Sequence, residues 1–156
     1  MKIQNLLVHD MILLGLESKE REDVLREMVG FLKKRNRIAR EKDLYEKLTQ
    51  REKLGSTAIG GGVAIPHCKL KGIKDPVVML AISKNGVNFH SLDGKPSHLF
   101  FLVTSSPDNP SLNLQILAAI AHLVRKANSL LKKVLAAENV PEILDIIREE
   151  EEKINE

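Results

Sequence analysis

Residues 76–83, PVVMLAIS, form an almost unbroken run of apolar side chains. A strand with one face in water alternates apolar and polar residues, whereas an unbroken run predicts a strand buried on both faces. A second run of this kind, SHLFFLVTS, occupies residues 97–105. Between them, residues 86–96 contain an Asp-Gly pair that is typical of a turn. We therefore expect these runs to lie inside a sheet that other elements cover.

The rest of the chain predicts helices and shorter strands around this centre. Residues 6–16 predict a first strand region with an internal turn. Residues 63–67, VAIPH, predict a short strand that ends at Pro66, because proline cannot donate a hydrogen bond to a strand ladder. The charged run REEEEKINE, residues 148–156, is typical of a solvated, frayed tail. The expected helices run from an N-cap at Ser18 to about Asn36 and over 41–50, 112–124, 129–138 and 141–150.

Helices interleaved with buried strands predict one layered α/β domain. A length of 156 residues fits a single domain with its own core. We find no internal repeat and no flexible linker, and we expect a domain over residues 1–150 followed by a charged C-terminal tail over residues 151–156.

Composition limits the cellular setting and the class of partner. No apolar run approaches the ~18 residues that span a bilayer, and the N-terminus lacks the pattern of a signal peptide. The single cysteine, Cys68, cannot form an internal disulfide and favours a reducing compartment. The net charge of +3 comes from basic residues interleaved with acids, and only four Phe and one Tyr are present. We therefore expect a cytoplasmic protein with no membrane insertion and no nucleic-acid partner.

The stretch GSTAIGGGVAIPHCK, residues 55–69, leads through several glycines to one histidine, His67. A neutral imidazole is a nucleophile, and its unperturbed pKa of ~6.5 leaves most of it neutral at pH 7. A phosphoryl group is an electrophile that brings negative charge, so it needs donors and cations around it. The residues alone thus indicate an anion or phosphoryl site at His67, or a histidine that is merely part of a loop.

The neighbours of His67 offer the groups that such a site needs. Glycines such as Gly60 and Gly62 let backbone amides approach an anion closely and form a cradle for it. Ser56 and Thr57 supply hydroxyls, and Arg51 supplies a planar fork suited to phosphate oxygens. Phosphoryl transfer depends mostly on positioning and charge stabilisation, so little other machinery is required.

Other readings of this stretch are weaker. The triple glycine is not followed by G-K-[ST] and does not follow a strand with G-x-G-x-x-G spacing, so it predicts neither a P-loop nor a dinucleotide site. Cys68 beside His67 fits no common zinc spacing. Adjacent side chains of a strand also point to opposite faces, which argues against a Cys68 nucleophile with His67 as its base.

Residues 51–69, REKLGSTAIGGGVAIPHCK, closely resemble the signature of enzyme IIA components of the phosphoenolpyruvate sugar phosphotransferase system. The match is to the fructose/mannitol type, which includes stand-alone nitrogen-regulatory members. That family's pattern is approximately R-E-x-x-x-S-T-x-(I/L)-G-x-G-(V/I)-A-(I/L)-P-H, and its fixed positions are matched from Arg51 to His67. The N-terminal helix pair, the GVNFHSLDGKPSHLFFLV segment and the LNLQILAAIAHLV helix also look like this family, so the resemblance covers nearly the whole chain.

The resemblance implies a fold and a chemistry. The fold would be a mixed β-sheet flanked by helices on both faces. His67, at Nε2, would accept a phosphoryl group from phospho-HPr and pass it to a IIB component, or hold it as a regulatory mark that controls a partner protein. Arg51 would help to hold the phosphate region, and Ser56 and Thr57 would support it through hydrogen bonds. No metal and no organic cofactor would be needed.

One position departs from the family pattern. The family usually carries a second histidine at the start of the long helix, where this chain has Asn113. An Asn amide can donate to a phosphate oxygen but cannot carry positive charge. His122, nine residues on, lies about half a turn away around the helix and cannot replace it. We predict that Asn113 lies beside His67 and donates to the phosphoryl group; the alternative is a divergent, regulatory member with slowed or lost transfer.

Overall fold

The two apolar runs form the central antiparallel pair of one six-stranded sheet in the computed structural model, which describes residues 1–155. These strands are β5 (Val77–Val87) and β6 (Ser97–Ser105). Both are buried over most of their length, as the unbroken apolar pattern predicted. The ring of Phe100, in β6, meets the ring of Phe89, which follows β5, edge to face with centroids 5.1 Å apart.

The sheet is mixed, with strand order β1-β5-β6-β3-β2 and with β4 also paired to β6. β1 is parallel to β5, β3 and β4 are parallel to β6, and β2 is antiparallel to β3. The four outer strands are β1 (Ile12–Leu14), β2 (Ala58–Gly60), β3 (Val63–Ala64) and β4 (His67–Lys69).

Strands β3 and β4 follow one another along the same edge of β6, with Pro66 between them. The Pro66 carbonyl accepts a hydrogen bond from Val103 N at 2.9 Å, so this edge stays paired although proline has no N–H to give. The predicted strand over 63–67 is therefore interrupted at Pro66 rather than ended there, and His67 is the first residue of the resumed strand.

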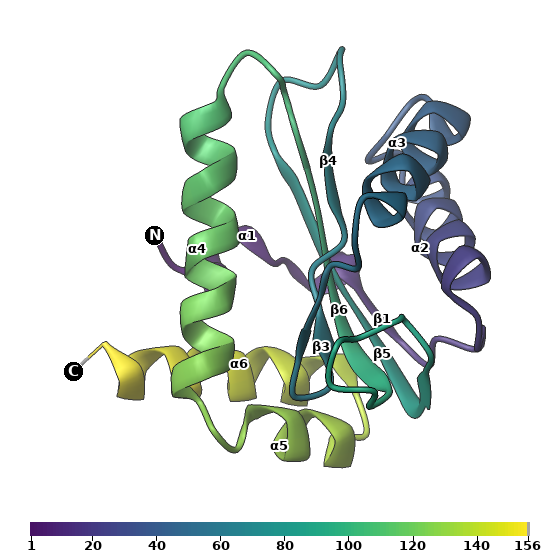
Figure 1. The fold of residues 1–156 in the computed structure, drawn as a ribbon. Coiled ribbons are helices and arrows are strands. Elements are labelled where there is room, and N and C mark those ends of the chain that lie inside the picture. The colour runs from purple at the N-terminus through teal and green to yellow at the C-terminus, as the bar shows by residue number, and fades with distance from the viewer. Residues whose placement is uncertain (156) are drawn as a thin grey trace.

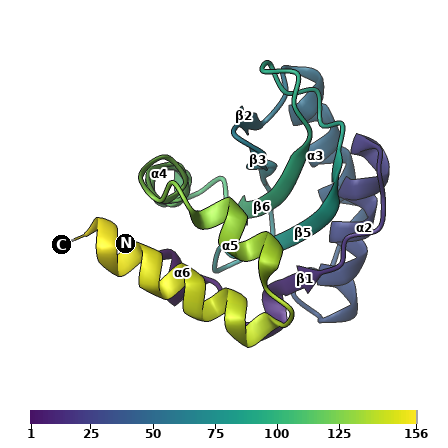
Figure 2. The same ribbon diagram turned by 90° about the horizontal axis from the view of Figure 1, so that it is seen from below.

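Helices cover both faces of the sheet (Figures 1 and 2), which confirms the predicted α/β fold. One layer holds α2 (Arg21–Lys34) and α3 (Glu41–Lys53). The other holds α4 (Pro110–Lys126), α5 (Leu130–Ala136) and α6 (Val140–Ile154), against which the short α1 (Ile3–Leu6) packs. A 3₁₀ turn over His9–Met11 leads into β1. None of the helices in residues 1–155 has the length and apolarity to cross a membrane.

Helix α4 begins two residues before the predicted start because local signals favour it. Asn109 lies at the N-cap, where its Oδ1 accepts a hydrogen bond from Leu112 N at 3.3 Å, and Pro110 occupies the first turn. This start places Asn113 in the first turn, on the side of α4 that faces the sheet.

Two predictions near the N-terminus are wrong. Ser18 is not an N-cap, because its backbone N and its Oγ both donate to the Glu27 carboxylate, at 2.9 and 2.7 Å, and α2 begins later, at Arg21. The first strand region is also shorter than residues 6–16, because only Ile12–Leu14 pair with β5.

The predicted tail is helical rather than frayed over most of its length. Helix α6 continues to Ile154, and Glu151 is buried. Its carboxylate accepts hydrogen bonds from Ile3 N at 2.6 Å and from Gln4 N at 2.8 Å. These bonds cap the start of α1 and compensate the burial of the charge. The expectation of a frayed tail is therefore wrong for residues 148–154, which are helical, and the expectation of solvation is wrong for Glu150 and Glu151, which are buried.

Candidate active site

His67 opens β4 with a ring whose two nitrogens are in different environments. Nδ1 lies 2.7 Å from the carbonyl oxygen of Ile65. A carbonyl oxygen can only accept, so Nδ1 must carry the proton in this contact. The neutral ring then has its lone pair on Nε2, which makes Nε2 the nucleophilic atom.

Burial lowers the pKa of His67 below its ordinary value, and the nearby Arg51 charge acts in the same direction. The hydrogen bond to Ile65 and the Glu52 carboxylate oppose this shift but do not cancel it. His67 is therefore neutral at pH 7, which is the state that a nucleophilic imidazole needs.

A cavity of about 630 Å³ opens at His67, between α3, β4 and the start of α4. Arg51 and Asn113 line it together with His67, so three of the sequence-predicted site residues meet here. They come from three elements that are far apart in the chain, and the sheet with its flanking helices is what brings them together.

Asn113 is buried, and one hydrogen bond sets the orientation of its side-chain amide. Its Oδ1 accepts a hydrogen bond from Ser105 Oγ at 2.8 Å. Its Nδ2 makes no hydrogen bond within residues 1–155. Every fully buried side-chain nitrogen or oxygen in that range has a hydrogen-bond partner, so an unbonded Nδ2 cannot be fully buried. Nδ2 is therefore accessible, and its two N–H groups are free to donate into the cavity.

Arg51 lies in the last turn of α3. Its Nη1 donates to the Gly55 carbonyl at 2.8 Å, which fixes the guanidinium at the edge of the cavity. The remaining N–H groups of the fork make no hydrogen bond within the described residues and can meet an anion.

Ser56 and Thr57 do not line the cavity, because their hydroxyls are used inside the protein. Ser56 Oγ donates to the Phe89 carbonyl at 2.6 Å. Thr57 Oγ1 donates to Glu52 at 2.5 Å, and Thr57 N donates to the other oxygen of the same carboxylate at 3.0 Å. Their hydrogen bonds fix the loop that follows Arg51, so their support for the site is indirect.

Gly60 and Gly62 do not form the expected cradle around His67. Gly60 ends β2 and Gly62 lies in the turn before β3, with φ angles of +89° and +82°, which favour glycine. The Gly62 carbonyl accepts from His98 N, whereas His67 is paired with Val103, five residues further along β6. At about 3.3 Å per residue this separation is about 16 Å, too far for these glycines to touch a group on His67.

The other chemical candidates near His67 are inactive in this arrangement. Burial raises the pKa of the Cys68 thiol to about 11, so the thiol is protonated at neutral pH and is not a nucleophile. Within the described part of the chain, no three His, Cys, Asp or Glu side chains are grouped to hold a metal ion.

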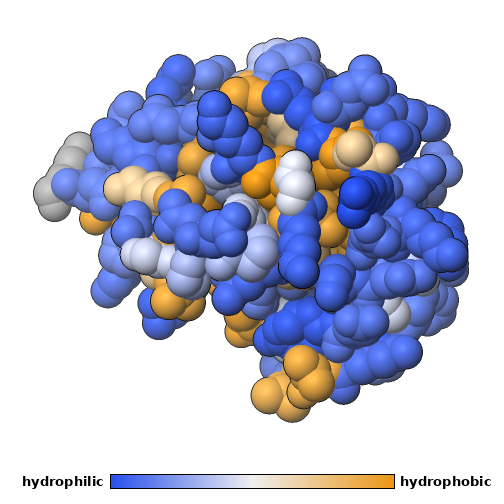
Figure 3. Space-filling model, turned by 90° about the horizontal axis from the view of Figure 1, so that it is seen from above, coloured by the Kyte–Doolittle hydropathy of each residue, from blue (hydrophilic) through white to orange (hydrophobic). Residues whose placement is uncertain are grey.

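Sequence reasoning missed several residues that line the cavity. Leu54 and Leu114 are 85% and 66% exposed, which is unusual for leucine, and they flank the opening. Seen from the end at which α4 begins, apolar residues gather near the centre of the face within a hydrophilic rim (Figure 3). Such a surface is typical of a protein docking site. The sequence signal was present in Leu114, which follows Asn113 directly, but helical periodicity alone could not separate it from the buried leucines of α4.

The chain is similar to known proteins over most of its length. The profile of the family described as "Phosphoenolpyruvate-dependent sugar phosphotransferase system, EIIA 2" matches residues 5–150. A nitrogen regulatory protein of Bradyrhizobium diazoefficiens is 33% identical over 94% of this chain and 95% of its own length. The fructose-specific EIIABC component of Bacillus subtilis is 37% identical over 96% of this chain, which spans only 23% of that longer protein.

The same relationship holds for solved structures. The nitrogen regulatory protein IIA-Ntr of Neisseria meningitidis superposes with a TM-score of 0.84 at 28% identity, covering 93% of this chain and 98% of its own. The profile match, the relatives and the shared fold together show that the chain belongs to the EIIA 2 family of the phosphoenolpyruvate-dependent sugar phosphotransferase system.

Proposed function

We propose that the protein is a phosphohistidine carrier in which His67 Nε2 accepts a phosphoryl group from phospho-HPr and passes it to a IIB component. The observation that carries this proposal is the hydrogen bond between His67 Nδ1 and the Ile65 carbonyl. It keeps the proton on Nδ1 and leaves the lone pair on Nε2, in a cavity that Arg51 and Asn113 also line.

In the transfer step, the Nε2 lone pair forms a bond to phosphorus while the bond between phosphorus and the donor's leaving atom breaks. Nδ1 keeps its proton and its bond to Ile65, so the ring needs no proton transfer of its own. The added charge on the phosphoryl oxygens meets the Arg51 fork and the Asn113 N–H groups, which stabilise it electrostatically.

The test is intact mass after incubation with enzyme I, HPr and phosphoenolpyruvate. We expect one added phosphoryl group that is stable in base and lost in acid, and none on a His67→Ala variant. Phosphoramidate, a small-molecule phosphoryl donor, serves as a second donor in case this HPr does not recognise the chain. Phosphorylation of His67→Ala, or no labelling of the wild type by either donor, would overturn the proposal.

A regulatory role is the second candidate, and one observation favours it. A nitrogen regulatory protein is 33% identical over 94% of this chain, and the solved nitrogen regulatory protein IIA-Ntr superposes with a TM-score of 0.84. In this role the phosphoryl group on His67 would alter the affinity for a target protein instead of moving on. Incubating the phosphorylated protein with a IIB component separates the two, because only a carrier returns to its unmodified mass at the rate at which IIB is labelled.

A further inference from the structure

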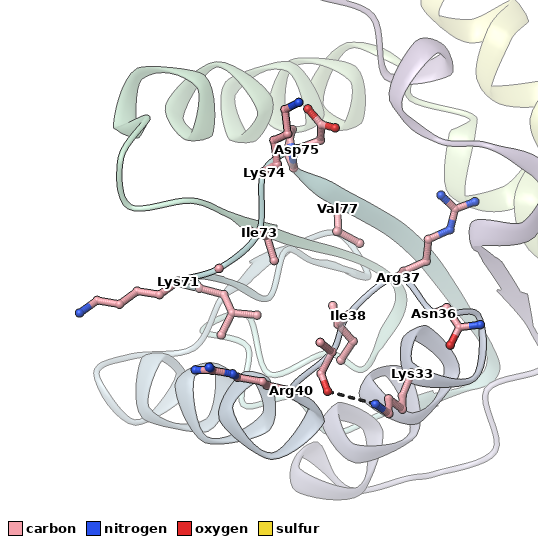
Figure 4. Close-up of a pocket in the computed structure, with 14 residues that line it drawn as sticks. Lys33, Asn36, Arg37, Ile38, Arg40, Lys71, Ile73, Lys74, Asp75 and Val77 are labelled. Carbon is pink, nitrogen blue, oxygen red and sulfur yellow. Dashed lines mark hydrogen bonds between the residues drawn. The ribbon is translucent and has the colours of Figure 1, made fainter.

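Three adjoining cavities run along α3 and form one groove. The His67 cavity shares three lining residues with a neighbour of about 460 Å³: Lys47, Gln50 and Lys69. That neighbour shares three residues with a third cavity of about 850 Å³, shown in Figure 4: Arg40, Leu70 and Lys71. The groove therefore extends from His67 along α3 to the turn between α2 and α3.

The groove concentrates the positive charge of the protein. Eight lysine and arginine side chains line it against three carboxylates, an excess of five. The whole chain has an excess of only three, so the remainder is net negative. Basic and acidic residues interleave along the sequence, but in the folded protein the groove has a net positive charge and the rest of the protein has a net negative charge. One wall carries Arg40, Lys47 and Arg51, and the other carries Lys69, Lys71 and Lys74.

Three cations along α3, from its N-cap Arg40 to Arg51 in its last turn, have a spacing that suits an extended ligand. Arg40, Lys47 and Arg51 are separated by seven and four residues, which places them on one side of the helix. They span eleven residues, or about 16 Å at 1.5 Å per residue. About five residues of extended peptide, at about 3.3 Å each, cover the same distance.

Most of these charges are not neutralised by the protein itself. Lys69, Lys71 and Lys74 make no ion pair or side-chain hydrogen bond within residues 1–155, and Arg40 makes only a 3.7 Å pair with Asp43. By contrast, Arg37 forms an ion pair with Asp10 at 2.9 Å, and Lys33 donates to the Ala39 carbonyl at 3.0 Å. Figure 4 shows Arg40 and Lys71 reaching out in the same direction from facing walls of the cavity.

We propose that this groove binds an acidic, extended segment of a partner protein, which lies along α3 with one end at the His67 cavity. Charge complementarity and continuity with the apolar docking surface around His67 support this occupant. The three cavities have no aromatic lining within the described residues, so the groove lacks the platform on which single-stranded nucleic acid stacks. A length of about 16 Å along α3 also exceeds what one small anion would contact.

The test is fluorescence anisotropy with a labelled eight-residue peptide of alternating Asp and Glu. The test variant combines Arg40→Glu, Lys71→Glu and Lys74→Glu. The control combines Lys95→Glu, Lys126→Glu and Lys132→Glu, which are exposed residues outside the groove and change the net charge equally. We expect the test variant to weaken binding at least tenfold and the control less than twofold. Lys71→Gln with Lys74→Gln is the milder variant if the triple does not fold.

Several outcomes would overturn the proposal. Equal weakening by both triples would mean that only the total charge matters. Equal binding of the Asn/Gln counterpart of the peptide, or tighter binding of duplex DNA or of inorganic tripolyphosphate than of the peptide, would assign the groove to another ligand or to none. The assay uses the unphosphorylated wild-type protein with no phosphoryl donor present, so the result is independent of whether His67 accepts a phosphoryl group.

Discussion

Replacing Asn113 by aspartate tests the proposed site most directly, because the two side chains have the same shape. A carboxylate oxygen at the Oδ1 position still accepts from Ser105 Oγ, so the buried 2.8 Å contact is kept. The other position changes from an N–H donor to an anion that faces the phosphoryl group on His67. The substitution therefore reverses one interaction in the site while leaving the packing of α4 unchanged.

The expected effect follows from two contributions. Losing a hydrogen bond to a charged group costs about 1.5–3 kcal/mol. Repulsion between two unit charges about 4 Å apart adds up to about 4 kcal/mol at an effective dielectric constant of 20. Since about 1.4 kcal/mol is a factor of ten in rate, the lost donor alone slows phosphorylation about 10- to 150-fold, and the lost donor together with full repulsion slows it by about 10⁴-fold or more. We expect Asn113→Asp to be at least 100-fold slower than the wild type.

The assay is single-turnover phosphorylation followed by intact mass, with HPr and with phosphoramidate as donors. Asn109→Asp is the matched control, because it makes the same chemical change on the same helix, outside the cavity, and keeps the cap to Leu112 N. If Asn113→Asp and Asn109→Asp were phosphorylated at rates within threefold of each other, Asn113 would not face the phosphoryl group.

The reciprocal substitution, Asn113→His, asks whether the departure from the family pattern impairs the site. If Nδ2 donates well enough, a histidine should change the rate by less than tenfold. A much faster variant would mean that the wild-type site is slow, and it would favour the regulatory role over the carrier.

Three further outcomes are expected. Glu151→Ala leaves the backbone N–H groups of Ile3 and Gln4 without acceptors, at about 1–3 kcal/mol each, so urea unfolding should show a loss of about 2–6 kcal/mol, whereas exposed Glu152→Ala should lose under about 0.5 kcal/mol. Because burial lowers the pKa of His67 in the folded state, the unfolded chain takes up this proton first. The contribution of neutral His67 to the free energy of unfolding is complete above pH ~6.5 and is lost as the pH falls through the lower pKa of the folded state. His67→Ala should therefore make the free energy of unfolding less dependent on pH between about pH 5 and 7.5. Gly62→Ala should destabilise the fold by about 1–3 kcal/mol, because φ is +82° and the new Cβ would lie 2.8 Å from a Leu131 methyl, yet the rate of His67 phosphorylation should stay within threefold of the wild type.

The sequence was informative where the signal is local. The buried strand over 97–105 has the bounds that its apolar run predicted, because every residue of the run is inside the sheet. His67, Arg51 and Asn113, which the family pattern and not periodicity singled out, line one cavity, while their roles in phosphoryl transfer stay a prediction.

The wrong predictions share one physical cause: the residues that surround each group are set by the tertiary structure and not by its neighbours in the sequence. Glu151 belongs to a charged run that looks solvated, but its partners are at the opposite end of the chain. Ser18 resembles a cap, yet its hydroxyl donates to Glu27, which lies nearly two turns inside the next helix. The glycines resemble a phosphate cradle, but the path of the chain through Pro66 carries His67 about 16 Å beyond them.

The bond between the Glu151 carboxylate and the start of α1 has a mechanical consequence. It fastens the two ends of the chain to each other on the α4–α6 side of the sheet, where both termini lie in Figure 1. A pulling force applied at the ends would load these two hydrogen bonds before it reached the ladder between β5 and β6. Under tension, α1 and the end of α6 should therefore unfold first, and the pairing of β4 with β6, which positions His67, should break later.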